Sequence, residues 1–238
     1  MADNYNARGL EFSNEEQKRS ASVSGNTSLV RVAGQQIVLY DYKPNRKPEN
    51  AEKFLEDFSG WLHADGYQGY HRLPENIRIV GCWAHARRKF NEALQVLPEE
   101  SRKDSQAAIG ERYCTELFRI EKQLAVLSPE DRYEQRLKQE KPVLDAMLVW
   151  ANDLYGKTAG KSALGKALYY LTEQWPYLVK YLEDGRLELS NNRAERSMPP
   201  FTGCCKMRCI SAIWYKPVTS VPPCTVKPKR QGRRTGWW

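Results

Sequence analysis

The sequence predicts a mixed α/β fold in which short strands precede a long helical stretch. Residues 61–65 and 77–80 are short apolar runs with aromatic or β-branched side chains, a composition typical of strands. Residues 98–180 instead carry apolar side chains at helical spacing over several segments. The chain has 238 residues, enough for one domain with a sizeable core. We therefore expect strands and helices in one domain, with residues 98–180 as a large all-helical insertion.

The strand predicted at Trp61 to Asp65 has the pattern of a half-buried strand and ends at Gly66, whose backbone turns easily. Asp65 is therefore expected at the carboxyl end of that strand. Upstream, Pro48 can occupy the first turn of a helix that runs through Phe58.

Four further helices are expected, at about 82–97, 101–126, 129–155 and 161–183. Ser128 and Pro129 have the residue types that begin a helix, a capping hydroxyl followed by a first-turn proline. Pro176 predicts a bend in the last of the four helices.

A second carboxylate follows a polar string far downstream. Ser190 can cap a helix whose first turn holds Asn191 and Asn192, and Glu195 then falls about a turn and a half into it. Two carboxylates from distant segments can hold Mg²⁺, which prefers oxygen ligands and can activate water or a DNA 3′-hydroxyl for attack on phosphate. Taken alone, an Asp before Gly is more often a turn residue, and a Glu beside arginines is more often an ion-pair partner.

The net charge of +8 is concentrated in the tail. Residues 202–238 hold eight basic residues and no acidic one, which leaves 29 basic against 29 acidic residues in the rest of the chain. Any nucleic-acid contact by residues 1–201 must therefore come from a local patch of positive charge.

Four segments carry a resemblance to a known family: IVLYDY (37–42), HADGYQGY (63–70), GCWAHARRKF (81–90) and the stretch from GKALYY to SMPPF (165–201). In order and spacing they resemble the insertion sequence 66-type transposases of bacterial mobile elements, over residues 37–201. The resemblance implies a DDE transposase with a ribonuclease H-like core, which uses two divalent ions, Mg²⁺ or Mn²⁺, to cut and join DNA at transposon ends.

The resemblance also assigns roles to residues. Asp65 matches the second acid of the triad and Glu195 the third, so both are expected to be catalytic and to bind metal. Cys82 and His85 match a Cys-x-x-His element that follows the second acid. DNA contacts are expected from two basic or polar groups: Arg87, Arg88 and Lys89, and Asn191, Asn192, Arg193 and Arg196. A basic helical run is usually a solvated face, but these cations follow a family motif and would lie beside phosphates.

The first acid of the triad has no match. Residues 1–36 are rich in Ser, Asn and Gly and contain Glu15 and Glu16 without an apolar run before them, so we expect a disordered leader.

Residues 202–238 depart from the family after Phe201 and are expected to be a disordered, out-of-frame tail whose deletion leaves thermal unfolding unchanged. The core fragment, residues 37–201, would then bind Mg²⁺ weakly and act as a truncated, impaired copy. The alternatives are an active transposase, a non-catalytic remnant that binds DNA or transposase, and a translated product without a stable fold.

Partners and location follow from the same reasoning. Transposon-end DNA is the expected partner, together with a second copy of the chain or a full-length transposase. No apolar stretch approaches 18 residues and no signal peptide opens the chain, so we expect a cytoplasmic, nucleoid-associated protein without membrane contact.

Overall fold

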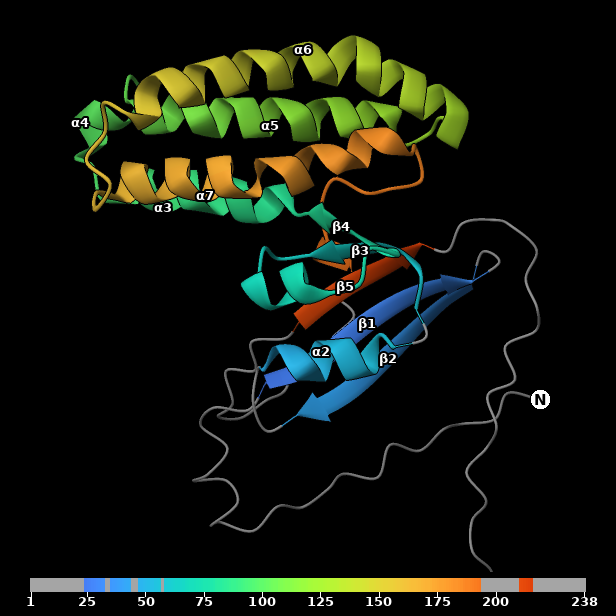
Figure 1. The fold of residues 1–238 in the computed structure, drawn as a ribbon. Helices are drawn as coiled ribbons and strands as arrows, with labels where there is room; N and C mark the ends of the chain where they lie inside the picture. Colours follow the sequence, from blue (N-terminus) through green and yellow to red (C-terminus); the bar gives the residue numbers. More distant parts are fainter. Residues whose placement is uncertain (1–23, 33–34, 44–46, 57, 194–209, 216–238) are drawn as a thin grey trace, which may run out of the picture.

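The computed structural model describes residues 24–32, 35–43, 47–56, 58–193 and 210–215 (Figure 1). The strands are β1 (Ser24–Val32), β2 (Gln35–Lys43), β3 (Gly60–Ala64), β4 (Ile77–Gly81) and β5 (Ile210–Tyr215). The helices are α2 (Pro48–Phe54), α3 (Trp83–Gln95), α4 (Glu99–Arg102), α5 (Gln106–Leu124), α6 (Pro129–Tyr155) and α7 (Ala163–Leu178), with 3₁₀ turns η2 (Gln68–Arg72) and η3 (Val179–Glu183). The predicted mixed α/β class is confirmed.

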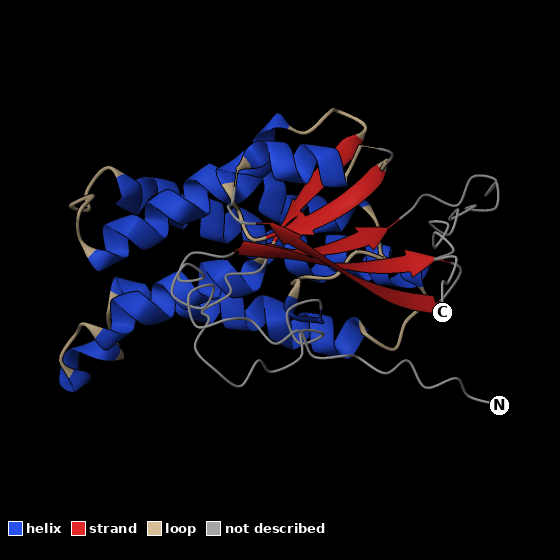
Figure 2. Cartoon of the chain, turned by 90° about the horizontal axis from the view of Figure 1, so that it is seen from below, coloured by secondary structure: helices blue, strands red, loops and turns tan. Residues whose placement is uncertain are grey.

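The strands form one sheet in the order β2-β1-β5-β3-β4. β1 and β2 are antiparallel, whereas β3 and β4 are parallel and in a register that pairs Ala64 with Gly81. β5 lies between the two pairs, parallel to β1 and antiparallel to β3. Figure 1 shows α3, α5, α6 and α7 gathered on one side of the molecule with the sheet on the other, and Figure 2 shows the strands from below.

Two of these strands correct the sequence-based expectations. β1 lies within residues 1–36, expected to be a disordered leader, and β5 lies within residues 202–238, expected to be a disordered tail. β5 is rich in β-branched and aromatic residues, and β1 contains Thr27, Val30 and Val32. The two strands pair with each other over six positions, and β1 also pairs with β2 and β5 with β3, so that backbone groups of both find partners. The expectation of disorder is therefore wrong for these two stretches.

The elements between the strands follow the predictions with shifted ends. α2 ends at Phe54, not at Phe58, and the helix expected at 101–126 is divided into α4 and α5. Ser105 causes that division, because its hydroxyl accepts the Ala108 N–H and begins a new helix. α6 matches its predicted bounds, and the Ser128 hydroxyl caps it by accepting the Asp131 N–H.

β3 is buried on both faces, where the sequence predicted a half-buried strand. Trp61 packs into the core formed with α3, α5, α6 and α7, while Leu62 and Ala64 pack on the opposite side with Ala51 and Leu55 near α2. A strand covered on both faces holds its carboxyl end in a fixed position. None of the helices in the described part of the chain combines the length and apolar composition that crossing a bilayer requires.

Candidate functional site

Asp65 begins the turn that follows β3, as predicted. Its Oδ1 accepts the N–H of Tyr67 at 3.2 Å, and Gly66 between them has φ of +75°, a conformation that favours glycine. β3 and β4 are parallel and in register, so Asp65 and Cys82 follow paired residues at the same edge of the sheet. The side chain of Asp65 is therefore fixed by the turn at the strand end, where side chains from several elements converge.

Helix α7 covers this turn. The Tyr170 hydroxyl donates to the backbone oxygen of Asp65 at 3.4 Å, and a Cβ at Gly66 would come within 2.9 Å of Gln174 Oε1. Burial raises the pKa of Tyr170, the charges of Cys82 and Asp65 raise it further, and Arg88 opposes them. Asp65 and Arg88 therefore both lie within electrostatic range of one tyrosine hydroxyl.

The three basic residues of α3, Arg87, Arg88 and Lys89, have different surroundings. Arg87 donates to Glu111 of α5 at 3.0 Å and lies over the Phe118 ring, and Lys89 donates to Glu92 at 3.1 Å. Arg88 is exposed, and its charge lowers the pKa of Tyr170. The steps of about 100° per residue in a helix produce this separation, and Arg88 is the member of the run whose charge reaches Tyr170 beside the Asp65 turn.

The Cys-x-x-His element forms the first turn of α3. Cys82 is fully buried, and the His85 N–H donates to the Cys82 oxygen at 3.1 Å. His63, on β3, lies 2.8 Å from the Gly81 oxygen through Nε2, and burial lowers its pKa to about 4, so its ring is neutral near pH 7. No group of three His, Cys, Asp or Glu side chains in the described ranges could hold a metal ion.

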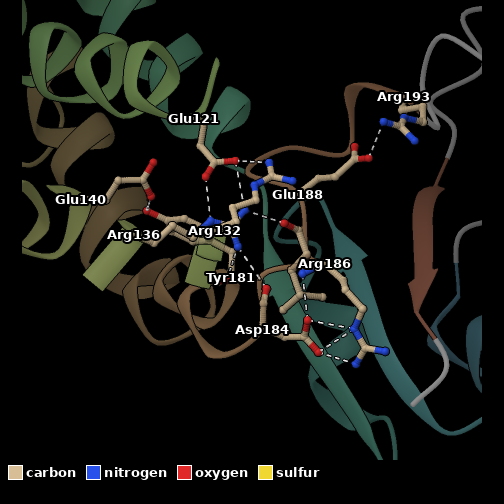
Figure 3. A network of polar contacts seen from close by, with 10 residues as sticks. Glu121, Arg132, Arg136, Glu140, Tyr181, Asp184, Arg186, Glu188 and Arg193 are labelled. Carbon is tan, nitrogen blue, oxygen red and sulfur yellow. Dashed lines mark hydrogen bonds and ion pairs between the residues drawn. The ribbon is translucent and has the colours of Figure 1, made fainter. Parts of the chain in front are cut away.

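The segment after α7 is held by Arg136, a residue that the sequence reasoning missed (Figure 3). Arg136 lies on α6, is fully buried and uses all five of its N–H donors. Two donate to the Glu121 carboxylate at 2.7 and 3.0 Å. The others donate to the backbone oxygens of Tyr181, Asp184 and Leu187 at 2.8, 3.0 and 2.7 Å. One guanidinium therefore fixes the chain between α7 and Ser190.

The same segment is anchored at the start of α3. The Trp83 indole N–H donates to the Leu178 oxygen at 2.9 Å, and the Trp83 backbone N–H donates to the Leu189 oxygen at 3.1 Å. Ser190 therefore begins beside the amino end of α3, at the same sheet edge as Asp65.

Ser190 to Arg193 lie where a helix begins, since residues 192 and 193 are helical. Asn191 is buried, although it was predicted to contact DNA. Asn192 is partly exposed, and Arg193 pairs with Glu188 at 2.7 Å with 38% of its side chain exposed (Figure 3). Glu195 and Arg196 lie outside the described residues, so the pairing of Asp65 with Glu195 stays a prediction.

A buried carboxyl group adjoins Arg136. Glu140, one turn along α6, is buried and accepts the Tyr181 hydroxyl at 2.5 Å. Burial and the charge of the Glu121 carboxylate raise the pKa of Glu140 to about 8. The sequence contained a signal for this network, because Arg136 and Glu140 continue the spacing of Leu144 and Met147 along the buried face of the helix.

Comparisons with known proteins identify the family. Residues 15–209 match the family model described as Transposase IS66 family. The chain belongs to this family. The match begins upstream of residue 37, where the sequence resemblance was placed, and so includes β1.

Three proteins of Sinorhizobium fredii (strain NBRC 101917 / NGR234) are similar to this IS66-family chain. Uncharacterized protein y4qI is 31% identical over 176 residues, which are 70% of the chain and 32% of that relative. Uncharacterized protein y4jD is 32% identical over 167 residues, 67% of the chain and 32% of the relative. Uncharacterized protein y4hP is 31% identical over 174 residues, 67% of the chain and 31% of the relative. The chain thus spans about a third of the length of these relatives, and no solved structure matches it.

Proposed function

We propose that this chain is part of the catalytic core of an insertion-sequence transposase, which cleaves transposon ends and joins them to new DNA. The observation that carries the proposal is the position of Asp65 in a member of the IS66 transposase family. Asp65 follows a doubly covered strand, and both the amino end of α3 and the anchored start of the 190–193 segment lie at the same sheet edge.

The fold proposed for this core is ribonuclease H-like. A mixed sheet in which an antiparallel pair, β1 and β2, is joined to a parallel pair, β3 and β4, supports it. In such an arrangement the helical layer formed by α3 and α7 covers the sheet beside the candidate acid.

Asp65 and Glu195 are the proposed metal ligands. The carboxylate of Asp65 is only partly buried at the end of its strand, and its hard oxygen donors fit Mg²⁺ or Mn²⁺. A divalent ion bound there would supply charge stabilisation at the phosphate. Arg88, Asn192 and Arg196 would contact the DNA backbone and orient it, because cations and amides at such an edge position phosphates. Arg193, paired with Glu188, would do so only by exchanging that carboxylate for a phosphate. Arg87 and Lys89, already paired with carboxylates, would add mainly long-range attraction.

A finer part of the proposal is that this chain alone is catalytically impaired. β5, the strand beside β3 in the sheet, contains no Asp or Glu, and β4 on the other side contains none. Neither neighbouring strand therefore brings a second carboxylate to Asp65. The same observation favours a second candidate function, a non-catalytic remnant that binds DNA or associates with a complete transposase.

The test measures metal binding and strand transfer separately. Mn²⁺ titration followed by electron paramagnetic resonance should show weak binding that Asp65→Asn or Glu195→Gln abolishes. Asp145→Asn, which removes an exposed carboxylate of α6, is the matched control and should bind as the wild type does. Equal binding by Asp65→Asn and the wild type would remove Asp65 from the metal site.

Strand transfer is assayed on duplexes that carry the DNA flanking the gene. The chain alone should give no joined product, since loss of a metal ligand removes both positioning and charge stabilisation. Adding an upstream strand with an Asp and restoring the family sequence after residue 209, where the family match ends, should give joining that Asp65→Asn abolishes. Robust joining by the 238-residue chain itself would overturn the impairment and indicate that a carboxylate such as Glu15 or Glu16 completes the triad.

A further inference from the structure

An open hollow lies directly beyond the Asp65 turn. It has a volume of about 450 Å³ and is lined by Pro48, Tyr67, Gln68, Gly69, His71 and Arg72. None of these six described residues carries a carboxylate, and Gln68, His71 and Arg72 are exposed. The hollow therefore presents polar and cationic groups to solvent immediately after a candidate catalytic acid.

Aromatic rings are fixed around this hollow. The imidazole of exposed His71 stacks on Tyr177 with ring centroids 4.6 Å apart and an interplanar angle of 25°. The Tyr67 ring meets Tyr70 edge to face at 5.7 Å and lies against the bare backbone of Gly69, where a Cβ would come within 2.2 Å of Tyr67 Cε1. Rings held in this way can receive a flat partner without losing much side-chain freedom.

Two cations accompany the rings. Arg72 is exposed and adjoins His71, and the Lys180 ammonium lies 5.6 Å from the centre of the Tyr177 ring. Cations beside aromatic side chains form the combination that binds the phosphates and the bases of one nucleic-acid strand. Of the rings here, that of His71 is the exposed one. In a duplex the base faces are stacked on each other, so only an unpaired strand can use the rings.

The hollow is joined to Asp65 by a hydrogen bond. Tyr67, which lines the hollow, donates its backbone N–H to Asp65 Oδ1 at 3.2 Å. A strand held against Tyr67 and His71 would therefore continue toward the carboxylate that is proposed to act on it.

We propose that the surface formed by Tyr67, His71, Arg72, Tyr177 and Lys180 binds an unpaired DNA strand next to Asp65. This inference rests on the proposed function and adds to it a specific contact surface and the strand form that it recognises. His71 stacks on a base, and Arg72 and Lys180 contact the adjacent phosphates.

Binding is measured by fluorescence anisotropy with a labelled oligodeoxythymidine of about 15 nucleotides, in EDTA so that metal binding does not contribute. His71→Ala should weaken binding about tenfold through the lost stacking contact. Arg72→Gln combined with Lys180→Gln should reduce the slope of log affinity against log salt by about 1.4, since each phosphate contact on a single strand contributes about 0.7.

Matched controls come from α6 and the turn that follows it, on the helical side of the molecule. Tyr155→Ala removes an exposed aromatic ring, and Lys138→Gln with Lys157→Gln removes two exposed cations. These control variants should leave unchanged the contribution that stacking on His71 makes to the affinity for the labelled strand. A 5-bromodeoxyuridine strand, cross-linked by light, should label the peptide that contains residues 67–72, a readout independent of attraction by the basic tail.

The outcomes are separable from those of the metal experiments. Equal losses of DNA affinity in the surface variants and the control variants would overturn the proposed surface and leave the metal assignment intact. Cross-links found only outside residues 67–72 and 177–180 would do the same. Equal weakening of duplex and single-strand binding by His71→Ala would overturn the preference for an unpaired strand. Absence of all DNA binding by the wild-type chain would contradict both this surface and the DNA-directed function.

Discussion

Replacing Glu140 by Gln should remove a loss of stability that the wild-type chain undergoes as the pH rises from 6 to 8. Burial and the Glu121 carboxylate raise the pKa of Glu140 to about 8 in the folded state, against an ordinary value of 4.5. Between these two values the folded chain keeps a proton that the unfolded chain releases. The free energy of unfolding therefore falls as the pH rises, and this contribution is complete only below about pH 4.5.

The magnitude follows from the span of pH. Each unit within this window costs at most about 1.4 kcal/mol, so a rise from about pH 6 to about pH 7.5 should cost about 2 kcal/mol. For a chain of this size that corresponds to roughly 4 to 8 °C in the unfolding temperature. Gln at position 140 is neutral at both pH values, and its carbonyl oxygen can still accept the Tyr181 hydroxyl.

The assay is thermal unfolding followed by circular dichroism at the two pH values and constant ionic strength. The difference in the free energy of unfolding between wild type and Glu140→Gln should change by about 2 kcal/mol between the two pH values. Glu134→Gln, on an exposed position of the same helix, should give a pH profile parallel to that of the wild type. A Glu140→Gln profile parallel to the wild type would refute the raised pKa and the buried, protonated carboxyl on which the argument depends.

Three further results are expected. His63→Gln should reduce the loss of stability as the pH falls from 6.5 to about 4. Burial lowers the pKa of His63 to about 4, so within this pH range only the unfolded chain takes up a proton on the imidazole. Urea unfolding at both ends of the range measures the change in the free energy of unfolding. Arg136→Lys should cost about 3 to 5 kcal/mol and speed amide exchange in residues 184–193, whereas Arg119→Lys at an exposed pair should have little effect. Deleting residues 202–238 should lower the unfolding temperature because β5 is removed, and deleting 216–238 should not; equal temperatures for both would contradict the pairing of β5.

Several features of the fold and site could be predicted because their determinants are adjacent in the sequence. Gly66 after an apolar run placed Asp65 at the end of β3, and Ser128 with Pro129 fixed the start of α6. These features depend on backbone conformation and on hydrogen bonds spanning a few residues, so the local sequence is sufficient. Family membership was likewise visible in short motifs and their spacing.

The chain segments outside the recognised motifs were harder to assign. β1 pairs with the adjacent β2 over nine positions, but it also pairs with β5 over six positions although nearly 180 residues separate the two strands. Neither β1 nor β5 reveals that distant partner locally. A strand's stability depends on the neighbour that satisfies its backbone groups, so composition alone favoured disorder for both segments.

The sequence by itself determined the family, the strand that ends just before Asp65 and the helix periodicities, because each is encoded by neighbouring residues. Only the tertiary structure decided the surroundings of the basic residues of α3, with Arg87 paired to Glu111 and Arg88 exposed within electrostatic range of Tyr170. It also decided that Arg136 binds backbone oxygens 45 to 51 residues away. Side-chain partners of this kind are selected by the packing of whole helices against one another, and that packing brings together groups that no local pattern relates.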